Sequence, residues 1–487
     1  MSFDTSALCP LTSVTSSGGN VAAFPETVKA GADPATRTVF GENSSLATRS
    51  ELPGVAGRNE WNIPVFDLLS ALSEVTNWVS PELMHHHRQV AYMAWNIGEE
   101  LGMPAQDLDD LVMAGLMHDI GAFTLKKRLE TLQFEMTTGR EHAEQGYLLM
   151  RGFEPFAHAA EMVRYHHLPW QNGQGAEASG KPVSLGCHLL HLADRIAVLI
   201  DRRVEVLGQV PRIRSAIESH ADSLFNPELI KCFSRRSVQE ALWLDMVSSS
   251  IESTLRRISP LSVLNLNIEG LLSLGNLFRC VIDFRSPFTA THSSGVAASA
   301  CTLAGLMRLP DHTCRLMRVA GYLHDLGKLG VPTEILEKPD KLTLEETNVV
   351  RHHPYGSIRS LEAIVDLREI TAWGALHHER INGSGYPFHL NTGKLPLEVR
   401  IMAVADVFTA VTEDRPYRAG MTSDQTRNVL EGMVRSSCLD PVIVDVLVSN
   451  FDVVDIARRV AQQSSIDEYK GFIEDISRIT ANHAGSR

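Results

Sequence analysis

Two stretches of the chain decide its fold: LDDLVMAGLMHDIGAF at residues 108–123 and CRLMRVAGYLHDLGKL at residues 314–329. In each stretch, apolar residues recur at helical spacing and lead directly into an adjacent His-Asp pair. Apolar positions at i, i+3, i+4 and i+7 are typical of an amphipathic helix. Each stretch is therefore predicted to be a helix that ends in an imidazole and a carboxylate.

The histidines and aspartates around these pairs repeat in the same order. The C-terminal copy has the candidate metal ligands His292, His324, Asp325, His353, His377, His378 and Asp406. The N-terminal copy has the corresponding set His86, His118, Asp119, His142, His166, His167 and Asp194. In both copies the first His precedes the His-Asp pair by 32 residues, and the single His precedes the His-His pair by 24. This recurrence indicates a duplicated domain.

These residue types are the ones that hold transition metals in proteins. A lone buried His is more often a core residue, but seven ligand-type residues at a repeated spacing favour a metal site. Two neighbouring divalent metals lower the pKa of a bridging water and hold a phosphoryl oxygen. We therefore expect two divalent transition-metal ions in the C-terminal copy, and mixed nitrogen and oxygen ligation suits Fe, Mn, Co or Zn. The N-terminal set is the candidate for a second metal site.

Composition limits the partners and the location. The net charge of −13 comes with no block of Lys and Arg, which argues against binding to long nucleic acid but allows a small phosphate ligand. No apolar run approaches the roughly 20 residues of a membrane helix. The seven cysteines are scattered without a CxxC pair, which predicts reduced thiols. A cytoplasmic protein without a membrane segment is expected.

The patterning divides the chain into four parts. Residues 1–60 are rich in Ser, Thr, Gly and Ala, and are predicted to be a disordered tail. The first metal-site domain is expected at 61–235 and the second at 286–487. Between them, 236–285 forms two amphipathic stretches, a helical linker that packs the halves together or makes a homodimer interface. Few stretches alternate with a period of two, so we predict an all-α protein of two helical bundles in tandem.

The residues that follow the ligand pairs of the C-terminal copy are distinctive. Residues 324–332 read HDLGKLGVP, residues 377–387 read HHERINGSGYP, and residues 415–418 read RPYR. With these segments the chain from about residue 264 to residue 451 resembles the HD-GYP family, a branch of the HD-domain metal-dependent phosphohydrolases. The resemblance implies an all-helical phosphodiesterase that opens cyclic di-GMP to linear pGpG in bacterial signalling. Some members of this family prefer cyclic GMP-AMP.

The resemblance also implies roles for individual residues. The seven histidines and aspartates of the C-terminal copy would hold the metals, with Asp325 central to catalysis. Lys328 would contact the scissile phosphate, and Arg415 and Arg418 would bind phosphates. Fixed cations of this kind stabilise the charge that develops on a phosphodiester. For the two arginines, a role at the surface or at a helix end is the alternative.

Two positions depart from the family pattern. Asn382 stands where the family usually has Asp, which we expect to alter loop bonding more than catalysis. Phe288 stands four residues before His292, where members with a third metal place an acidic ligand. The resemblance therefore implies a two-metal site and weakens the expectation of further hydrolysis of pGpG.

The N-terminal copy resembles a generic HD domain and lacks the additional features. Ala122 takes the place of Lys328, residues 168–175 replace the GYP loop, and at most Arg203 remains of the arginine pair. Three interpretations stay open. In the first, the domain binds metal but is catalytically weak, and regulates or braces the C-terminal copy. In the second it is another phosphohydrolase with a different substrate, and in the third the site is vestigial and its histidines are merely packed.

Together these patterns predict a cyclic-dinucleotide phosphodiesterase that needs no protein nucleophile. One rival is a non-catalytic cyclic di-GMP receptor that binds through Lys328, Arg415 and Arg418. The intact ligand set disfavours it, because a receptor need not keep every metal ligand. The other rival is an HD phosphohydrolase acting on mononucleotides, which the GYP loop and the RPYR segment disfavour.

Overall fold

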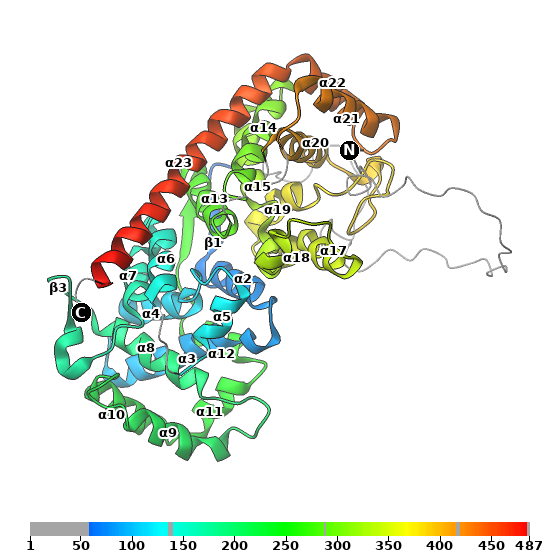
Figure 1. Ribbon diagram of the computed structural model, residues 1–487. Coiled ribbons are helices and arrows are strands. Elements are labelled where there is room, and N and C mark those ends of the chain that lie inside the picture. Colours follow the sequence, from blue (N-terminus) through cyan, green and yellow to red (C-terminus); the bar gives the residue numbers. More distant parts are fainter. Residues whose placement is uncertain (1–57, 135–139, 287–288, 415–418, 485–487) are drawn as a thin grey trace, which may run out of the picture. The chain divides into compact units, whose positions relative to one another are not determined.

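The computed structural model describes residues 58–134, 140–286, 289–414 and 419–484 (Figure 1). The described residues are 69 % helical, which confirms the predicted all-α fold. Strands are confined, within the described ranges, to two short antiparallel pairs. They are β1 (Trp61–Pro64) with β4 (Val263–Leu266), and β2 (Glu177–Ala178) with β3 (Lys181–Pro182). The predicted disordered tail falls almost entirely outside the described residues.

The chain forms two compact units, each with its own core. The N-terminal unit comprises Glu60–Thr291, Leu326–Ile364 and Gln463–Arg487, whereas the C-terminal unit is built mainly from His292–Asp325 and Val365–Gln462. The N-terminal unit therefore holds the whole first copy together with a segment of the second. These units do not coincide with the predicted domain boundaries, which remain predictions.

The helices of each unit follow in chain order. The α-helices of the N-terminal unit are α2 (Val65–Asn77), α3 (His86–Leu101), α4 (Ala105–Met117), α5 (Leu125–Thr131), α6 (Arg140–Met150), α7 (Ala157–Tyr165), α8 (Leu185–Val198), α9 (Val210–Glu218), α10 (Pro227–Arg236), α11 (Glu240–Val247), α12 (Ile251–Ile258), α13 (Ile268–Asp283), α16 (Thr333–Leu336), α17 (Leu344–Arg351) and α18 (His353–Leu361). Those of the C-terminal unit are α14 (His292–Leu306), α15 (Asp311–Leu323), α19 (Arg368–Ala375), α20 (Leu397–Thr412), α21 (Ser423–Arg435) and α22 (Pro441–Ser449), and α23 (Phe451–Ala484) contributes to both. Short 3-10 turns are η3 (Pro81–Leu83), η4 (Glu154–Phe156), η5 (Gln171–Ala176), η6 (Leu207–Gln209), η7 (Leu326–Gly330), η8 (Val365–Leu367) and η9 (Thr392–Lys394).

The duplication is visible in how the central helices pack. In the first copy α3 packs on α4 and α8, and in the second α14 packs on α15 and α20. A Cβ atom on Gly115 of α4 would lie 2.6 Å from the Cα of Ala91, and one on Gly321 of α15 would lie 2.5 Å from the Cα of Ala297. Only glycine allows such a close approach of two backbones. Both glycines stand three residues before the His of the His-Asp pair, so the close helix contact positions that pair in each copy.

Much of the predicted linker belongs to the N-terminal bundle. The side-chain amide of Gln89 on α3 donates to the carbonyl of Met246 at 2.8 Å, and the Tyr92 hydroxyl donates to Asp245 at 2.8 Å. Strand β4 pairs with β1, with Trp61 opposite Leu266. A linker that packs the halves together, or that forms a homodimer, stays a prediction.

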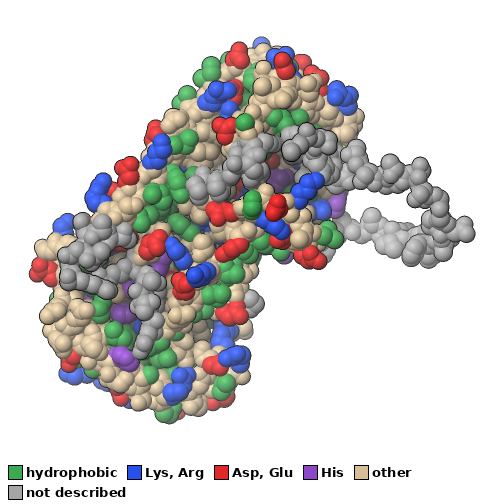
Figure 2. All heavy atoms as spheres, viewed as in Figure 1, with side chains coloured by type: hydrophobic (Ala, Val, Ile, Leu, Met, Phe, Trp, Pro, Cys, Tyr) green, Lys and Arg blue, Asp and Glu red, His purple; other side chains and the backbone are tan. Residues whose placement is uncertain are grey.

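The surface agrees with the acidic composition. On the face shown in Figure 2, described Lys and Arg side chains are interspersed with Asp and Glu and form no continuous basic area. Among the described residues, no helix has both the length and the apolar character that crossing a bilayer requires.

The cysteines follow the expectation of reduced thiols at five positions. Free thiols are found at Cys187, Cys232, Cys280, Cys301 and Cys314. Cys9 lies outside the described residues.

Candidate metal centre

The C-terminal unit brings six of the predicted ligands to the ends and inner faces of its central helices. His292 opens α14, Asp406 lies on α20, and the pairs His324-Asp325 and His377-His378 directly follow α15 and α19. The ligand atoms of His292, His324 and Asp406 lie within 4.8 Å of one another, as do those of His324, Asp325 and His377. His324 Nε2 lies 3.0 Å from Asp325 Oδ2. The rings of His377 and His378 are 4.0 Å apart.

Backbone carbonyls orient the imidazoles of this cluster. His324 Nδ1 lies 2.7 Å from the carbonyl oxygen of Gly321, and His377 Nδ1 lies 2.9 Å from that of Gly374. When Nδ1 carries the proton and donates it to a carbonyl, Nε2 presents a lone pair. Both rings therefore turn their Nε2 atoms towards the centre of the cluster in the tautomer that binds a cation.

A carboxylate that the sequence analysis missed supports His292. Glu413 Oε2 lies 3.1 Å from His292 Nδ1 and accepts a hydrogen bond of 3.4 Å from the side-chain amide of Gln462. A carboxylate behind an imidazole fixes its orientation and raises its basicity as a ligand. The only signal in the sequence is spacing, because Glu413 follows Asp406 by seven residues, or two helical turns.

The aspartate of α20 is charged despite its burial. Burial alone would raise the pKa of Asp406, but the neighbouring His292, His377 and His378 hold this pKa well below its usual value. A negative carboxylate among imidazoles is the donor set that Fe, Mn, Co and Zn accept. The residues of this cluster therefore fit a divalent transition metal.

The GYP loop lies directly against the His-His pair. The ring of Tyr386 stacks on that of His378, with centroids 4.8 Å apart and an interplanar angle of 24°. A Cβ atom on Gly385 would lie 2.4 Å from the Cα of Glu379, so only glycine fits there. The buried carboxylate of Glu379 in turn accepts the backbone N–H of Phe388 at 2.7 Å. The loop is thus held over one wall of the cluster.

Asn382 has its role within this loop. Its side-chain oxygen accepts the N–H of Ser384 at 2.9 Å, and its amide nitrogen donates to the carbonyl of Ser436 at 3.0 Å. An Asp could make the first bond but not the second, because an ionised carboxylate has no donor. The departure from the family pattern therefore affects loop bonding, as expected.

The two remaining described residues of the predicted site, Lys328 and His353, belong to the N-terminal unit. Lys328 lies on η7 and His353 opens α18, where it is buried. A Cβ atom on Gly327 would lie 2.0 Å from the carbonyl oxygen of His353, and the Gly327 N–H donates to Ser357 Oγ at 2.8 Å. The turn with Lys328 is therefore packed closely on α18. That both residues complete the C-terminal cluster stays a prediction, and Phe288, Arg415 and Arg418 lie outside the described residues.

The N-terminal unit brings all seven residues of its predicted set together. They come from α3, α4, α6, α7 and α8 or directly follow these helices: His86, His118, Asp119, His142, His166, His167 and Asp194. His86 Nε2 lies 3.2 Å from Asp194 Oδ1, and His142 Nε2 lies 3.2 Å from Asp119 Oδ1. The Nε2 atoms of His142 and His166 are 3.3 Å apart.

Unsatisfied atoms in this cluster point to a cation. His86 Nε2, His118 Nε2, Asp119 Oδ1 and Asp194 Oδ1 are buried and make no hydrogen bond of good geometry, although His86 Nε2 and Asp194 Oδ1 lie 3.2 Å apart. A buried polar group without a partner costs about 1–3 kcal/mol. These four atoms come from α3, α8 and the His-Asp pair after α4, and a divalent cation among them would satisfy all of them.

The protonation states agree with this fit at most positions. Burial and the neighbouring imidazoles hold the pKa values of His166 and His167 well below the usual range, so both are neutral ligands. At His118 burial acts in the same direction, but the carboxylates of Asp119 and Asp194 outweigh it and raise the pKa to about 9. A divalent cation at this place would displace that proton.

One buried arginine distinguishes the N-terminal cluster. Arg195 donates to Asp194 Oδ2 from Nη2 at 2.6 Å and from Nε at 3.2 Å, and to the carbonyl of Thr131 at 2.9 Å. The corresponding residue after Asp406 is Val407. The sequence analysis missed Arg195, although a charged residue on the otherwise apolar α8 was a signal. This arginine pairs directly with one carboxylate of the N-terminal cluster, whereas the buried Arg380 of the C-terminal unit donates to the carbonyl of His377 at 2.9 Å.

Comparisons with known proteins agree with this duplication. The HD-domain family profile matches residues 83–199 and 276–443. The chain is 29 % identical over 402 residues to the 3'3'-cGAMP-specific phosphodiesterase 1 of Vibrio cholerae, covering 80 % of this chain and 93 % of that protein. It is 44 % identical over 137 residues to a cyclic di-GMP phosphodiesterase of Pseudomonas aeruginosa, covering 27 % of this chain and 32 % of that one.

A solved structure shares the fold. The crystal structure of a cyclic GMP-AMP specific phosphodiesterase of Vibrio cholerae matches with a TM-score of 0.52 at 20 % sequence identity. The match covers 80 % of this chain and 98 % of that chain. The likeness therefore extends over both copies and the segments that connect them.

Proposed function

Because this chain belongs to the HD-domain family and has two HD domains in tandem, we propose that it is a metal-dependent phosphodiesterase for a cyclic dinucleotide. Its C-terminal domain is the catalytic one. Addition of water to one phosphodiester bond places a hydroxyl on phosphorus and a proton on the leaving 3' oxygen. With cyclic di-GMP the product is linear pGpG.

The observation that supports this proposal best is the buried His and Asp cluster of the C-terminal unit. Six predicted ligands converge there, and two of their rings are oriented by carbonyls while His292 is oriented by Glu413. Bound metals would lower the pKa of a water and hold a phosphoryl oxygen. We assign the seven predicted residues of this copy, His353 included, as ligands of two divalent ions, Fe or Mn.

The other assigned residues act on the substrate. Lys328 stabilises the negative charge that builds up on the phosphoryl oxygens. Arg415 and Arg418 bind the phosphates of the ring through charge-assisted hydrogen bonds. Tyr386, stacked on His378, holds the GYP loop at the edge of the cluster.

Two substrates are candidates. Cyclic di-GMP is the prediction from the HD-GYP segments, and relatives named for it match about a third of the chain. A specific observation favours 3'3'-cGAMP as the second candidate. The relative named for that substrate aligns over both copies and over 93 % of its own length.

For the N-terminal domain we propose metal binding without turnover of the dinucleotide. Its seven ligands converge, but Ala122 takes the place of Lys328 and Arg195 pairs with Asp194. A second phosphohydrolase activity remains the alternative, and the convergent unsatisfied atoms disfavour a merely packed cluster. We further expect the protein to act in the cytoplasm.

Product chromatography tests the proposal. The purified full-length protein is incubated with cyclic di-GMP or 3'3'-cGAMP, in Mn²⁺ or in anaerobic Fe²⁺, beside the Asp325→Ala variant. A linear dinucleotide formed only by the unmutated protein supports the enzyme, and the ratio of kcat/KM values identifies the substrate. Metal binding and tight dinucleotide binding without product would instead support the receptor. Turnover of mononucleotides alone would support the other rival.

A further inference from the structure

A single buried arginine joins the His-Asp loop of the N-terminal domain to the turn that contains Lys328. Arg285 follows α13 and is 8 % exposed. Its Nη1 donates to the carbonyl of Lys328 at 2.8 Å, and its Nη2 donates to that of Val331 at 3.0 Å. Its Nε donates to the carbonyl of Phe123 at 3.3 Å. One guanidinium therefore contacts the backbone of the N-terminal His-Asp loop and the backbone of the turn that contains Lys328.

Thr333 closes this joint. Its hydroxyl donates to the carbonyl of Phe123 at 3.0 Å and accepts a bond of 3.1 Å from Arg285 Nη2. Phe123 stands four residues after Asp119, in the loop of the N-terminal His-Asp pair. Thr333 and Lys328 stand eight and three residues after Asp325. The two His-Asp loops are thus tied to each other through Arg285.

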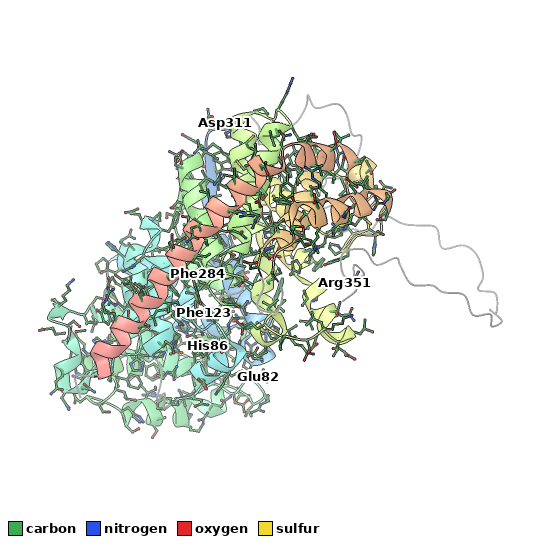
Figure 3. The ribbon with its side chains drawn as sticks, turned by 45° about the horizontal axis from the view of Figure 1, so that its top comes forward. Glu82, His86, Phe123, Phe284, Asp311 and Arg351 are labelled. Carbon is green, nitrogen blue, oxygen red and sulfur yellow. The ribbon has the colours of Figure 1, made fainter. Side chains whose placement is uncertain are left out.

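Buried aromatic side chains pack beside this joint. The rings of Phe123 and Phe284 both contact Phe472 of α23, at centroid distances of 6.2 and 5.2 Å, and Figure 3 shows Phe123 and Phe284 near this helix. Burial lowers the pKa of Arg285 to about 9, so it stays protonated at neutral pH. A buried guanidinium is stable only where its donors are satisfied, which makes its geometry specific.

The turn itself is held on its other side by the N-terminal unit. Trp78, at the end of α2, packs on Gly330 and Gly356, where added Cβ atoms would lie 3.2 and 2.6 Å from it. Gly327 packs directly on α18, because a Cβ atom there would clash with the carbonyl oxygen of His353. Replacing Arg285 would remove the hydrogen bond from its guanidinium to the carbonyl of Lys328.

We propose that Arg285 is a positioning residue for Lys328, and that the N-terminal domain supports the catalytic turn through it. The inference rests on the proposed function, since it takes Lys328 as the residue that meets the phosphate. It also gives the N-terminal domain a mechanical role that does not depend on its own turnover. A displacement of about 1 Å at a group that contacts the transition state can cost on the order of 100-fold in rate.

The test compares Arg285→Met with Arg279→Met in the full-length protein. Arg279 is the control, because it is also buried on the same segment, but its described partners are Ser465, Asn276, Glu468 and the ring of Phe284 rather than the turn. Arg285→Met is expected to lower kcat about 10- to 100-fold with C-terminal metal content unchanged. Arg285→Lys should recover part of the loss. Arg279→Met should keep kcat within about threefold of the unmutated value.

A double-mutant cycle separates positioning from general destabilisation. In a Lys328→Ala background, Arg285→Met is expected to have little further effect on kcat, because the residue it positions is gone. Losses that multiply in full would overturn the proposal, as would equal losses in the Arg285 and Arg279 variants.

Thr333→Val covers the case in which Arg285→Met does not fold. This near-isosteric change should speed hydrogen exchange of the amides from Leu326 to Thr333 and lower kcat about threefold. Unchanged exchange with unchanged kcat would overturn the proposal. The exchange measurement needs no substrate. If the protein has no phosphodiesterase activity, the proposed function is wrong, but hydrogen exchange still tests whether Arg285 and Thr333 hold the turn.

Discussion

The N-terminal and C-terminal clusters contain the same residue types in the same order but differ in what stands behind them. In the C-terminal cluster, Glu413 supports His292 and a loop with Tyr386 lies against His378. In the N-terminal cluster, Arg195 occupies one oxygen of Asp194. If the C-terminal cluster alone is catalytic, as we propose, the residues around the candidate ligands make the difference. They orient the imidazoles, leave the carboxylate charge available and bind the phosphate.

The histidines show what both copies share. His118 and His324 each place Nδ1 against the carbonyl of the glycine three residues earlier, at 2.9 and 2.7 Å. The same glycine allows the close approach of two helices in each copy. The ligand and its helix packing were thus duplicated together, whereas the surroundings diverged.

The largest expected effect separates the two clusters directly. Asp325→Asn should remove C-terminal metal and lower kcat by on the order of 10³-fold, because it removes a ligand that carries charge. Asp119→Asn, its counterpart, should lower the metal content of the N-terminal domain and change kcat by less than about threefold. Metal analysis and turnover of both variants check this. Equal losses of turnover would show that the N-terminal domain shares in the chemistry.

Lys328→Ala should have the next largest effect. The metals should remain bound while kcat falls about 10²- to 10³-fold, since a fixed cation beside the developing charge is lost. Lys338→Ala is the control, because Lys338 forms an ion pair with Glu346 on the neighbouring segment. Steady-state kinetics and bound-metal analysis of both variants test this prediction. A kcat close to that of the unmutated protein would remove Lys328 from the site.

Glu413→Gln tests the support of His292. The amide cannot raise the basicity of the imidazole as a carboxylate does, so C-terminal metal affinity should fall about 10- to 100-fold. Asp201 stands seven residues after Asp194, as Glu413 does after Asp406, but pairs with Arg203 instead. Asp201→Asn should therefore leave N-terminal metal affinity unchanged. Metal titration of both variants makes the comparison, and similar affinity losses would contradict it.

The smallest effect is expected at Asn382. Asn382→Asp loses the bond to the carbonyl of Ser436, which contributes about 0.5–1.5 kcal/mol. Thermal unfolding should detect this loss, while kcat should stay within about threefold because the metal ligands are untouched. A loss of kcat as large as that of Lys328→Ala would mean that the loop takes part in the chemistry.

The repeated spacing was enough to predict the fold class and to pick out the residues that converge, six in the C-terminal unit and seven in the N-terminal one. Apolar periodicity places the His-Asp pairs at helix ends, and this information is local, because it depends on residues within a few turns of one another. Glu413 and Arg195 were not predicted. Their roles depend on how distant segments pack, and a single charged residue on a buried helix has many explanations.

By itself, the sequence determined a helical protein with two HD domains and picked out seven candidate metal ligands in each copy. Tertiary structure alone decided that the segment with Lys328 and His353 packs with the N-terminal domain. It also decided that Arg285 contacts both His-Asp loops. The physical reason is that periodicity encodes which face of a helix is buried, whereas the partner of a buried arginine is selected only when the chain has closed around it.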